Sequence, residues 1–213
     1  MKLLKTVLAM AALVLTSGMA GAEMVAPDVL VKNTANEVLE VVKKDKDIQN
    51  GDMKKIYALA EEKILPHFDF ERMSRIVLGK YWGRATKEQQ DTFVKEFRSL
   101  ITRTYSSALS KYRNQTIEYK PLRAQPGDTD VTVKTQIVQP GGQPIPVDYT
   151  LEKGGDEWKV YDVTIEGVSL VTNYRGQFST EIRDNGMDGL IQRLVEKNKQ
   201  SPSSVAASDK KPG

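Results

Sequence analysis

The stretch WKVYDVTIEGVSLVTNYRGQF, residues 158–178, changes its hydrophobic period at Gly167. Three large apolar residues alternate with polar neighbours before this glycine: Tyr161, Val163 and Ile165. Three more recur at helical spacing after it: Leu170, Tyr174 and Phe178. Ser169 stands where the N-cap of that helix is expected. The stretch therefore predicts a strand that ends at Gly167 and passes directly into a helix.

The residues before this stretch show the same period-two alternation, interrupted by short turns. Glycine-containing turn sequences occur at 126–128, 140–142 and 154–155. The apolar positions between the turns are Ile117, Tyr119, Val131, Val133, Val147, Tyr149 and Leu151. Such short connections join neighbouring antiparallel strands, and alternation indicates a sheet covered on one face. We predict an antiparallel meander from about residue 116 to residue 165.

Residues 27–112 instead follow the helical period. Two apolar stripes predict the first two helices: Val31, Ala35, Val38 and Val42, then Met53, Ile56, Ala60 and Ile64. Asp69 is expected to cap a third helix, which ends at Gly79. Thr86 and Gln89 form a capping-box pattern that begins a fourth helix of about 25 residues. Helices before and after an antiparallel sheet define an α+β fold, and we expect them on the concave face.

The two ends of the chain predict export. Lys2 and Lys5 precede an unbroken apolar run at 7–15, and an A-x-A pattern ends at Ala22. This is the form of a secretory signal peptide spanning residues 1–22. Residues 201–213 are rich in Ser and Pro, which predicts a disordered tail. The segment between them, 23–200, has the length of a single domain, with a helical part at about 27–112 and a sheet with helices at about 115–198.

Charge and cysteine content exclude several classes of protein. The chain has 31 Lys and Arg against 28 Asp and Glu, and the predicted signal peptide contains two of the lysines. The mature chain is therefore nearly neutral, which gives a nucleic-acid partner no electrostatic support. There is no cysteine. An exported protein of this sequence would thus be held together by its core, without disulfides.

Catalytic patterns are sparse. His67 is the only histidine in the sequence, and no nucleophile elbow or phosphate-binding loop occurs. It stands at a corner between helices, where a structural role is expected. The pair Glu61-Glu62 falls on a solvated helix face. Asp162 falls on the outward side of a strand, so it is expected at the surface or at the sheet edge. We predict neither an enzyme nor a metal site.

The positive signal is a set of large apolar side chains directed at one interior. Twelve of them are predicted to contact an apolar ligand: Phe97, Ile101, Tyr105, Val131, Val133, Val147, Tyr149, Tyr161, Val163, Ile165, Leu170 and Tyr174. The same pattern would be produced by a solidly packed core. Periodicity alone does not distinguish a filled core from a lined cavity.

Three motifs carry a resemblance to a known family. They are FDFERMSRIVLGKYW at 68–82, ATKEQQDTFVKEF at 85–97, and the stretch at 158–178. Together they resemble the MlaC family, also called the toluene-tolerance auxiliary family, of periplasmic phospholipid-binding proteins. The resemblance extends from about Ala26 to Lys197, and the family offers no catalytic residue to transfer.

The resemblance implies a curved antiparallel sheet of cystatin or NTF2 type, packed against a helical layer and enclosing a cavity for acyl chains. It implies a phospholipid as cargo and no other cofactor. It also implies lipid exchange with an inner-membrane ABC transporter complex and an outer-membrane lipoprotein–porin complex, which would maintain outer-membrane lipid asymmetry. An NTF2-like periplasmic enzyme and a chaperone for apolar protein surfaces remain alternatives.

Overall fold

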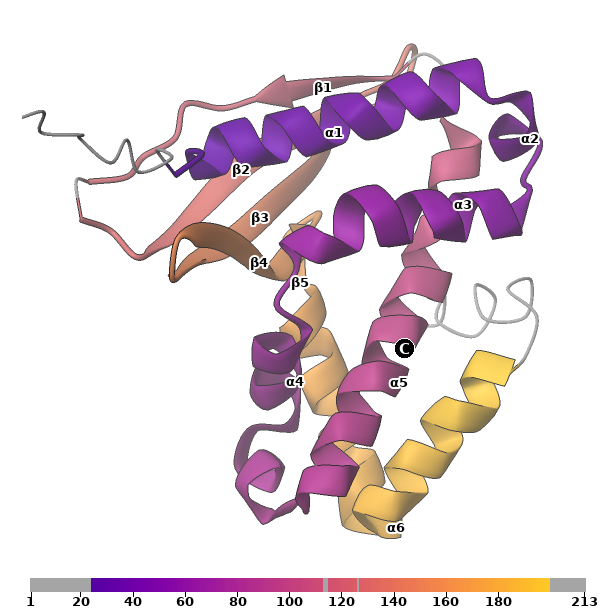
Figure 1. Cartoon of the computed structure of the whole chain (residues 1–213), viewed down its shortest axis with the longest axis vertical. Helices are drawn as coiled ribbons and strands as arrows, with labels where there is room; N and C mark the ends of the chain where they lie inside the picture. Colours follow the sequence, from indigo (N-terminus) through magenta and orange to yellow (C-terminus); the bar gives the residue numbers. More distant parts are fainter. Residues whose placement is uncertain (1–23, 113–114, 126, 200–213) are drawn as a thin grey trace, which may run out of the picture.

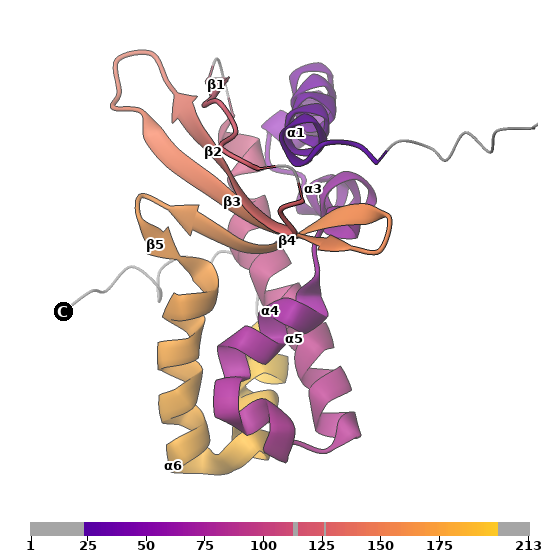
Figure 2. The ribbon, with the colours of Figure 1, turned by 90° about the vertical axis from the view of Figure 1, so that its left-hand side faces the viewer.

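The computed structural model describes residues 24–112, 115–125 and 127–199. The predicted signal peptide and the predicted disordered tail lie outside the described residues. The described part forms an upper layer, in which a long helix lies across a sheet, and a lower column of helices (Figures 1 and 2).

The sheet has five antiparallel strands in the order β1-β2-β3-β4-β5. The strands are β1 (Thr116–Tyr119), β2 (Asp130–Val138), β3 (Ile145–Gly154), β4 (Glu157–Ile165) and β5 (Val168–Ser169). Each strand pairs with the next one along the chain. The predicted meander and the α+β fold class are therefore confirmed.

The helices occupy both ends of the described chain. The α-helices are α1 (Pro27–Lys44), α2 (Lys46–Gln49), α3 (Met53–Leu59), α4 (Phe70–Leu78), α5 (Lys87–Ser106) and α6 (Leu170–Lys199). The shorter turns are a π-helical turn, η1 (Ala60–Ile64), and the 3₁₀ turns η2 (Leu65–His67), η3 (Gly79–Arg84) and η4 (Leu109–Lys111). The predicted fourth helix is shorter than expected, because its last turn is the separate turn η4. α6 contains a kink, where Gly186 has φ 74°.

Two helix starts follow directly from the sequence. The side chain of Asp69 accepts a hydrogen bond from the backbone N–H of Arg72 at 2.8 Å and caps α4. Thr86 and Gln89 exchange side-chain and backbone hydrogen bonds at the start of α5. Both predicted caps are confirmed, and each satisfies N–H groups that a helix leaves without an internal partner.

The lower column of helices has its own core. α4, α5 and α6 pack around four aromatic rings with centroids 5.4–6.0 Å apart: Phe93, Phe97, Tyr174 and Phe178. Our expectation placed these rings against the sheet. The structure places them below it, because α6 runs away from the sheet after β5 and meets α5 instead (Figure 2).

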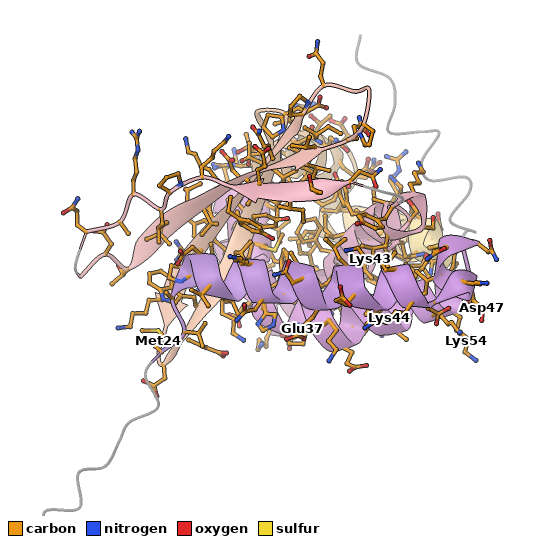
Figure 3. The ribbon with its side chains drawn as sticks, turned by 90° about the horizontal axis from the view of Figure 1, so that it is seen from above. Met24, Glu37, Lys43, Lys44, Asp47 and Lys54 are labelled. Atoms are coloured by element: carbon orange, nitrogen blue, oxygen red, sulfur yellow. The ribbon has the colours of Figure 1, made fainter. Side chains whose placement is uncertain are left out.

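α1 covers the sheet in the upper layer. Its buried side includes Val31, which packs with the apolar face of β2, β3 and β4. Its opposite side carries Glu37, Lys43 and Lys44, which are exposed and visible from above in Figure 3. α1 is thus amphipathic, with the sheet on one side and solvent on the other.

The expectation for Asp162 is wrong. Its side chain is only 8% exposed, and it accepts hydrogen bonds from the hydroxyl of Ser169 at 2.6 Å and from the backbone N–H of Val171 at 3.2 Å. The physical reason is that the start of α6 covers this side chain. Asp162 pairs with Thr150 and stays on the face opposite Val163, where Ser169 and Val171 lie over it. A β-bulge lies beside it: Tyr149 pairs with Val163, whereas Leu151 pairs with Val160, so β4 holds one extra residue, Tyr161.

Removing the Asp162 carboxylate should therefore destabilise the junction between sheet and α6. We expect Asp162→Ala to lower the free energy of unfolding by about 1–3 kcal/mol, because the buried N–H of Val171 and the part-buried hydroxyl of Ser169 lose their acceptor. Urea unfolding followed by circular dichroism measures the change. Asp156→Ala, in the exposed turn after β3, is the matched control and should shift stability by less than about 0.5 kcal/mol. Equal stability of the two variants would contradict the assignment.

Candidate functional site

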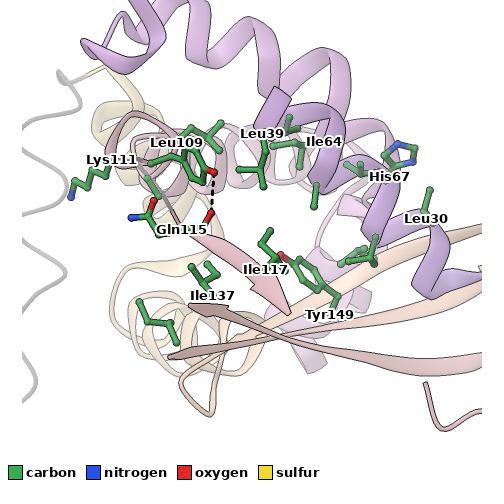
Figure 4. Close-up of a pocket in the computed structure, with 18 of the residues that line it drawn as sticks. Leu30, Leu39, Ile64, His67, Leu109, Lys111, Gln115, Ile117, Ile137 and Tyr149 are labelled. Atoms are coloured by element: carbon green, nitrogen blue, oxygen red, sulfur yellow. Dashed lines mark hydrogen bonds between the residues drawn. The ribbon is translucent and has the colours of Figure 1, made fainter. Parts of the chain in front are cut away.

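A cavity of about 410 Å³ lies between α1 and the sheet (Figure 4). α1 contributes two adjacent rows of side chains: Leu30, Val31, Thr34, Ala35, Val38 and Leu39. The sheet contributes Ile117, Ile137, Ile145, Tyr149 and Val160. The remaining wall comes from the turns around α3 and from the chain between α5 and β1: Ile64, His67, Phe68, Ala108, Leu109, Lys111, Tyr112, Gln115 and, after β2, Gln139.

The cavity exists because of how α1 is built. Leu30 and Leu39 are the large side chains at the two ends of its lining rows. The middle of the lining rows carries the short side chains of Thr34 and Ala35. Short side chains at the centre of a helix–sheet contact leave space that the neighbours do not fill. The walls are dominated by Leu, Val, Ile and Ala, so the space suits an apolar ligand.

Tyr149 makes the sheet wall polar without adding charge, and Tyr119 lies near it outside the lining. Burial raises the pKa of Tyr149 to about 12, and the nearby phenol of Tyr119 adds to the shift. The hydroxyl of Tyr119 is buried, and no described residue offers it a hydrogen bond. Both phenols are therefore neutral at physiological pH, and the wall carries no anion that would repel a phosphate.

His67 lies on the cavity wall, at the end that also holds Leu30 (Figure 4). Its pKa is lowered, first by burial and then by the positive charge of Lys159. The imidazole is therefore neutral at pH 7. No carboxylate of the described residues forms an ion pair with it, and no group of three His, Asp or Glu among those residues is arranged to hold a metal ion.

Of the twelve residues predicted from the sequence, Tyr149 lines the cavity. Six others pack together where the sheet meets α1 and the start of α6: Val131, Val133, Val147, Val163, Ile165 and Leu170. Three lie in the core of the helical column: Phe97, Ile101 and Tyr174. Tyr105 packs against both groups.

Tyr161, the last of the twelve, points to the other face of the sheet. Its hydroxyl donates to Asp130 at 2.8 Å, and the guanidinium of Arg72 lies 4.1 Å from its ring centroid. The bulge in β4 accounts for this position, because Tyr161 is the extra residue. Sequence reasoning missed the wall formed by α1. The signal was present in the stripe of Val31, Ala35 and Val38, whose central alanine is unusually small for a helix covering a sheet.

A cavity with mainly aliphatic walls between a helix and a sheet is typical of a protein that binds an apolar ligand. Comparison with known proteins identifies the family. The family model described as "MlaC protein" matches residues 32–196. The chain therefore belongs to the MlaC family, as its motifs predicted.

Individual relatives agree with this assignment. The chain is 31% identical over 163 residues to the toluene tolerance protein ttg2D of Pseudomonas putida, covering 76% of this chain and 75% of that protein. It is 27% identical over 177 residues to the intermembrane phospholipid transport system binding protein MlaC of Haemophilus influenzae, covering 82% and 83%.

A solved structure shares the fold. It is a phospholipid-binding protein from Ralstonia solanacearum in complex with a phospholipid, 39% identical, with a TM-score of 0.78. The match covers 85% of this chain and 99% of that one. Within the described ranges of the present chain, no helix combines the length and the apolar character needed to cross a bilayer.

The phenol of Tyr149 gives a direct test of the enclosed wall. Because its pKa is raised from the ordinary value of about 10 to about 12, the folded protein holds this proton more tightly than the unfolded chain does. The resulting stabilisation is complete below pH 10 and is lost as the pH rises towards 12. We expect the alkaline difference spectrum between the wild type and Tyr149→Phe to show one phenol ionising near pH 12. Ionisation near pH 10 in the folded protein would contradict an enclosed position.

Proposed function

We propose that this protein is a periplasmic phospholipid carrier that encloses acyl chains in the cavity beneath α1. The observation that carries the proposal is the cavity itself, which is walled by aliphatic side chains and covered by a single helix. The named functions of the relatives support it, because they include an intermembrane phospholipid transport component and a protein solved with phospholipid bound.

The physical need for such a cavity follows from the cost of exposing lipid tails. Each methylene brought out of water contributes about 0.8 kcal/mol. Two acyl chains of about 15 carbons each would therefore cost on the order of 20 kcal/mol to expose. A carrier must shield the tails from water throughout transport between membranes, whereas the phosphate head group can remain exposed to water. Aliphatic walls and few charges are what this task requires.

We propose that the acyl chains contact α1 and the facing strands, through residues such as Val31, Ala35, Val38, Ile137 and Tyr149. Of the other eleven residues predicted from the sequence, the six that pack where the sheet meets α1 and the start of α6 would then support the walls from behind, without lining the space. In this proposal, bound phospholipid is the cargo and no further cofactor takes part.

The cellular role extends the same proposal. The predicted signal peptide places the mature chain in the periplasm, between two membranes. We propose that it exchanges phospholipid with an inner-membrane ABC transporter complex and with an outer-membrane lipoprotein–porin complex, and so helps to maintain lipid asymmetry. A passive carrier has no energy source of its own, so the direction of net transport would be set by these partners.

Lipid occupancy tests the cavity directly. Protein purified from a bacterial envelope should carry phospholipid at roughly one molecule per chain, measured by lipid extraction and native mass spectrometry. Ala35→Trp places an indole in the space beneath α1 and should reduce occupancy at least about fivefold, because it removes room for methylenes that contribute about 0.8 kcal/mol each.

The matched control is Asn36→Trp, one residue further along α1 on its exposed side. This variant adds the same side chain to the same helix without entering the cavity, and it should keep wild-type occupancy. Circular dichroism verifies that both variants fold. Equal lipid content in the two folded variants would contradict the proposal that the acyl chains occupy this cavity.

Recovery of unchanged lipid separates a carrier from an enzyme. His67 on the cavity wall is the residue that an enzyme would use as a base. We expect phospholipid incubated with the protein to be recovered intact, as judged by mass spectrometry. A lysophospholipid or fatty acid product that disappears with His67→Ala would establish an enzyme instead.

A further inference from the structure

The two ends of the cavity differ in chemistry. One end is formed by Lys111 and Gln115, and the other holds His67 and Leu30 (Figure 4). Between them the walls are dominated by aliphatic side chains, with Tyr149 on the sheet side. A phospholipid is also polar at one end and apolar along its tails. Its head group can therefore lie at either end of the cavity, and the two orientations differ in free energy.

The fold brings the polar residues of the first end together. Thr116 of β1 pairs with Val138 of β2, so the preceding Gln115 and the following Gln139 are neighbours at the same end of the sheet. The hydroxyl of Tyr112 donates to the backbone carbonyl of Gln115 at 2.9 Å. This bond holds the chain after η4 against the start of β1, so Lys111 lies at the same end.

Charge distinguishes this end from the other. Lys111 is exposed, lines the cavity, and has no ion-pair or hydrogen-bond partner for its ammonium among the described residues. At the opposite end, neither Lys32 nor Lys159 lines the cavity. The ammonium of Lys32 lies 6.0 Å from the ring centroid of Tyr119. The ammonium of Lys159 is already engaged by Glu157 at 2.8 Å and by the carbonyl of Pro66 at 2.7 Å. An anion therefore finds an available cation at the Lys111 end.

Resting on the proposed phospholipid cargo, we propose that the lipid lies with its phosphodiester at the end formed by Lys111, Gln115 and Gln139 and with its acyl chains directed towards Phe68 and Val160. A lysine presents a point charge, and the two amides present neutral hydrogen-bonding groups. These groups recognise the phosphodiester that all glycerophospholipids share. They contain no carboxylate to select an amino head group, so the site fixes orientation and leaves the head group unselected.

Paramagnetic broadening of the phosphorus resonance tests the orientation. The native sequence has no cysteine, so Gln143→Cys and Asp156→Cys each give a single site for a nitroxide label. Gln143 lies in the exposed turn between β2 and β3, next to the proposed phosphate end, and Asp156 lies in the exposed turn at the other end of β3. The ten residues of β3 separate the two turns by roughly 33 Å.

The labelled proteins are loaded with dioleoyl phosphatidylglycerol, and lipid extraction measures the loading. We expect the label at residue 143 to broaden the ³¹P resonance of bound lipid strongly, and the label at residue 156 to leave it sharp. Equal or reversed broadening in loaded protein would overturn the orientation while leaving the proposed cargo intact. Failure of the wild type and of both variants to load lipid would overturn the proposed function and the orientation together.

A second measurement tests the role of Lys111. An exposed ion pair contributes little, so Lys111→Gln should weaken equilibrium binding of dioleoyl phosphatidylglycerol from vesicles by about two- to fivefold. Binding of dioleoylglycerol, which has the same tails and no phosphate, should not change. Lys43→Gln on the outer side of α1 is the control and should leave both unchanged. Equal weakening for the two lipids, or no weakening for either, would overturn the assignment of Lys111.

Discussion

The structure depends on the apolar contact between α1 and the sheet. One face of the meander is apolar and must be covered, because exposing it to water would cost about 25 cal/mol for each square ångström. α1 covers that face, but the side chains of Thr34 and Ala35 in the middle of its lining rows are too short to fill the space against the strands. The sheet needs a cover, and the short residues of this cover leave the cavity.

The helical column below explains how the molecule tolerates an incomplete core in the upper layer. The aromatic cluster of α5 and α6, including Phe97 and Phe178, packs rings at 5.5–6.0 Å and leaves its largest members almost fully buried. The Asp162 network fastens this column to the sheet at the start of α6. Dense packing in one layer thus supplies stability that the hollow layer does not.

The sequence predicted the elements of the fold better than it predicted the site. The turns, the two helix caps and the change of period at Gly167 depend on local chemistry, which a single sequence displays. The bulge at Tyr161 does not, because nothing in the local sequence indicates that β4 holds one extra residue, and this residue places Tyr161 on the face opposite to the expected one. The path of α6, which turns the stripe of Tyr174 and Phe178 away from the sheet, also does not depend on local chemistry. Twelve ligand contacts were predicted on the assumption that all apolar faces share one interior, and the structure has separate ones.

The gap beneath α1 also links the cargo to the rigidity of the protein. A ligand in that gap takes the place that larger side chains at residues 34 and 35 would otherwise occupy. Such an occupant completes the packing between α1 and the strands, so any free energy of binding adds to the free energy of folding by mass action. The protein with bound ligand would be the more stable and more rigid form, and the protein without ligand the less stable and more flexible one. A partner that binds both forms could then distinguish them by how easily α1 is displaced from the sheet, without contacting the lipid.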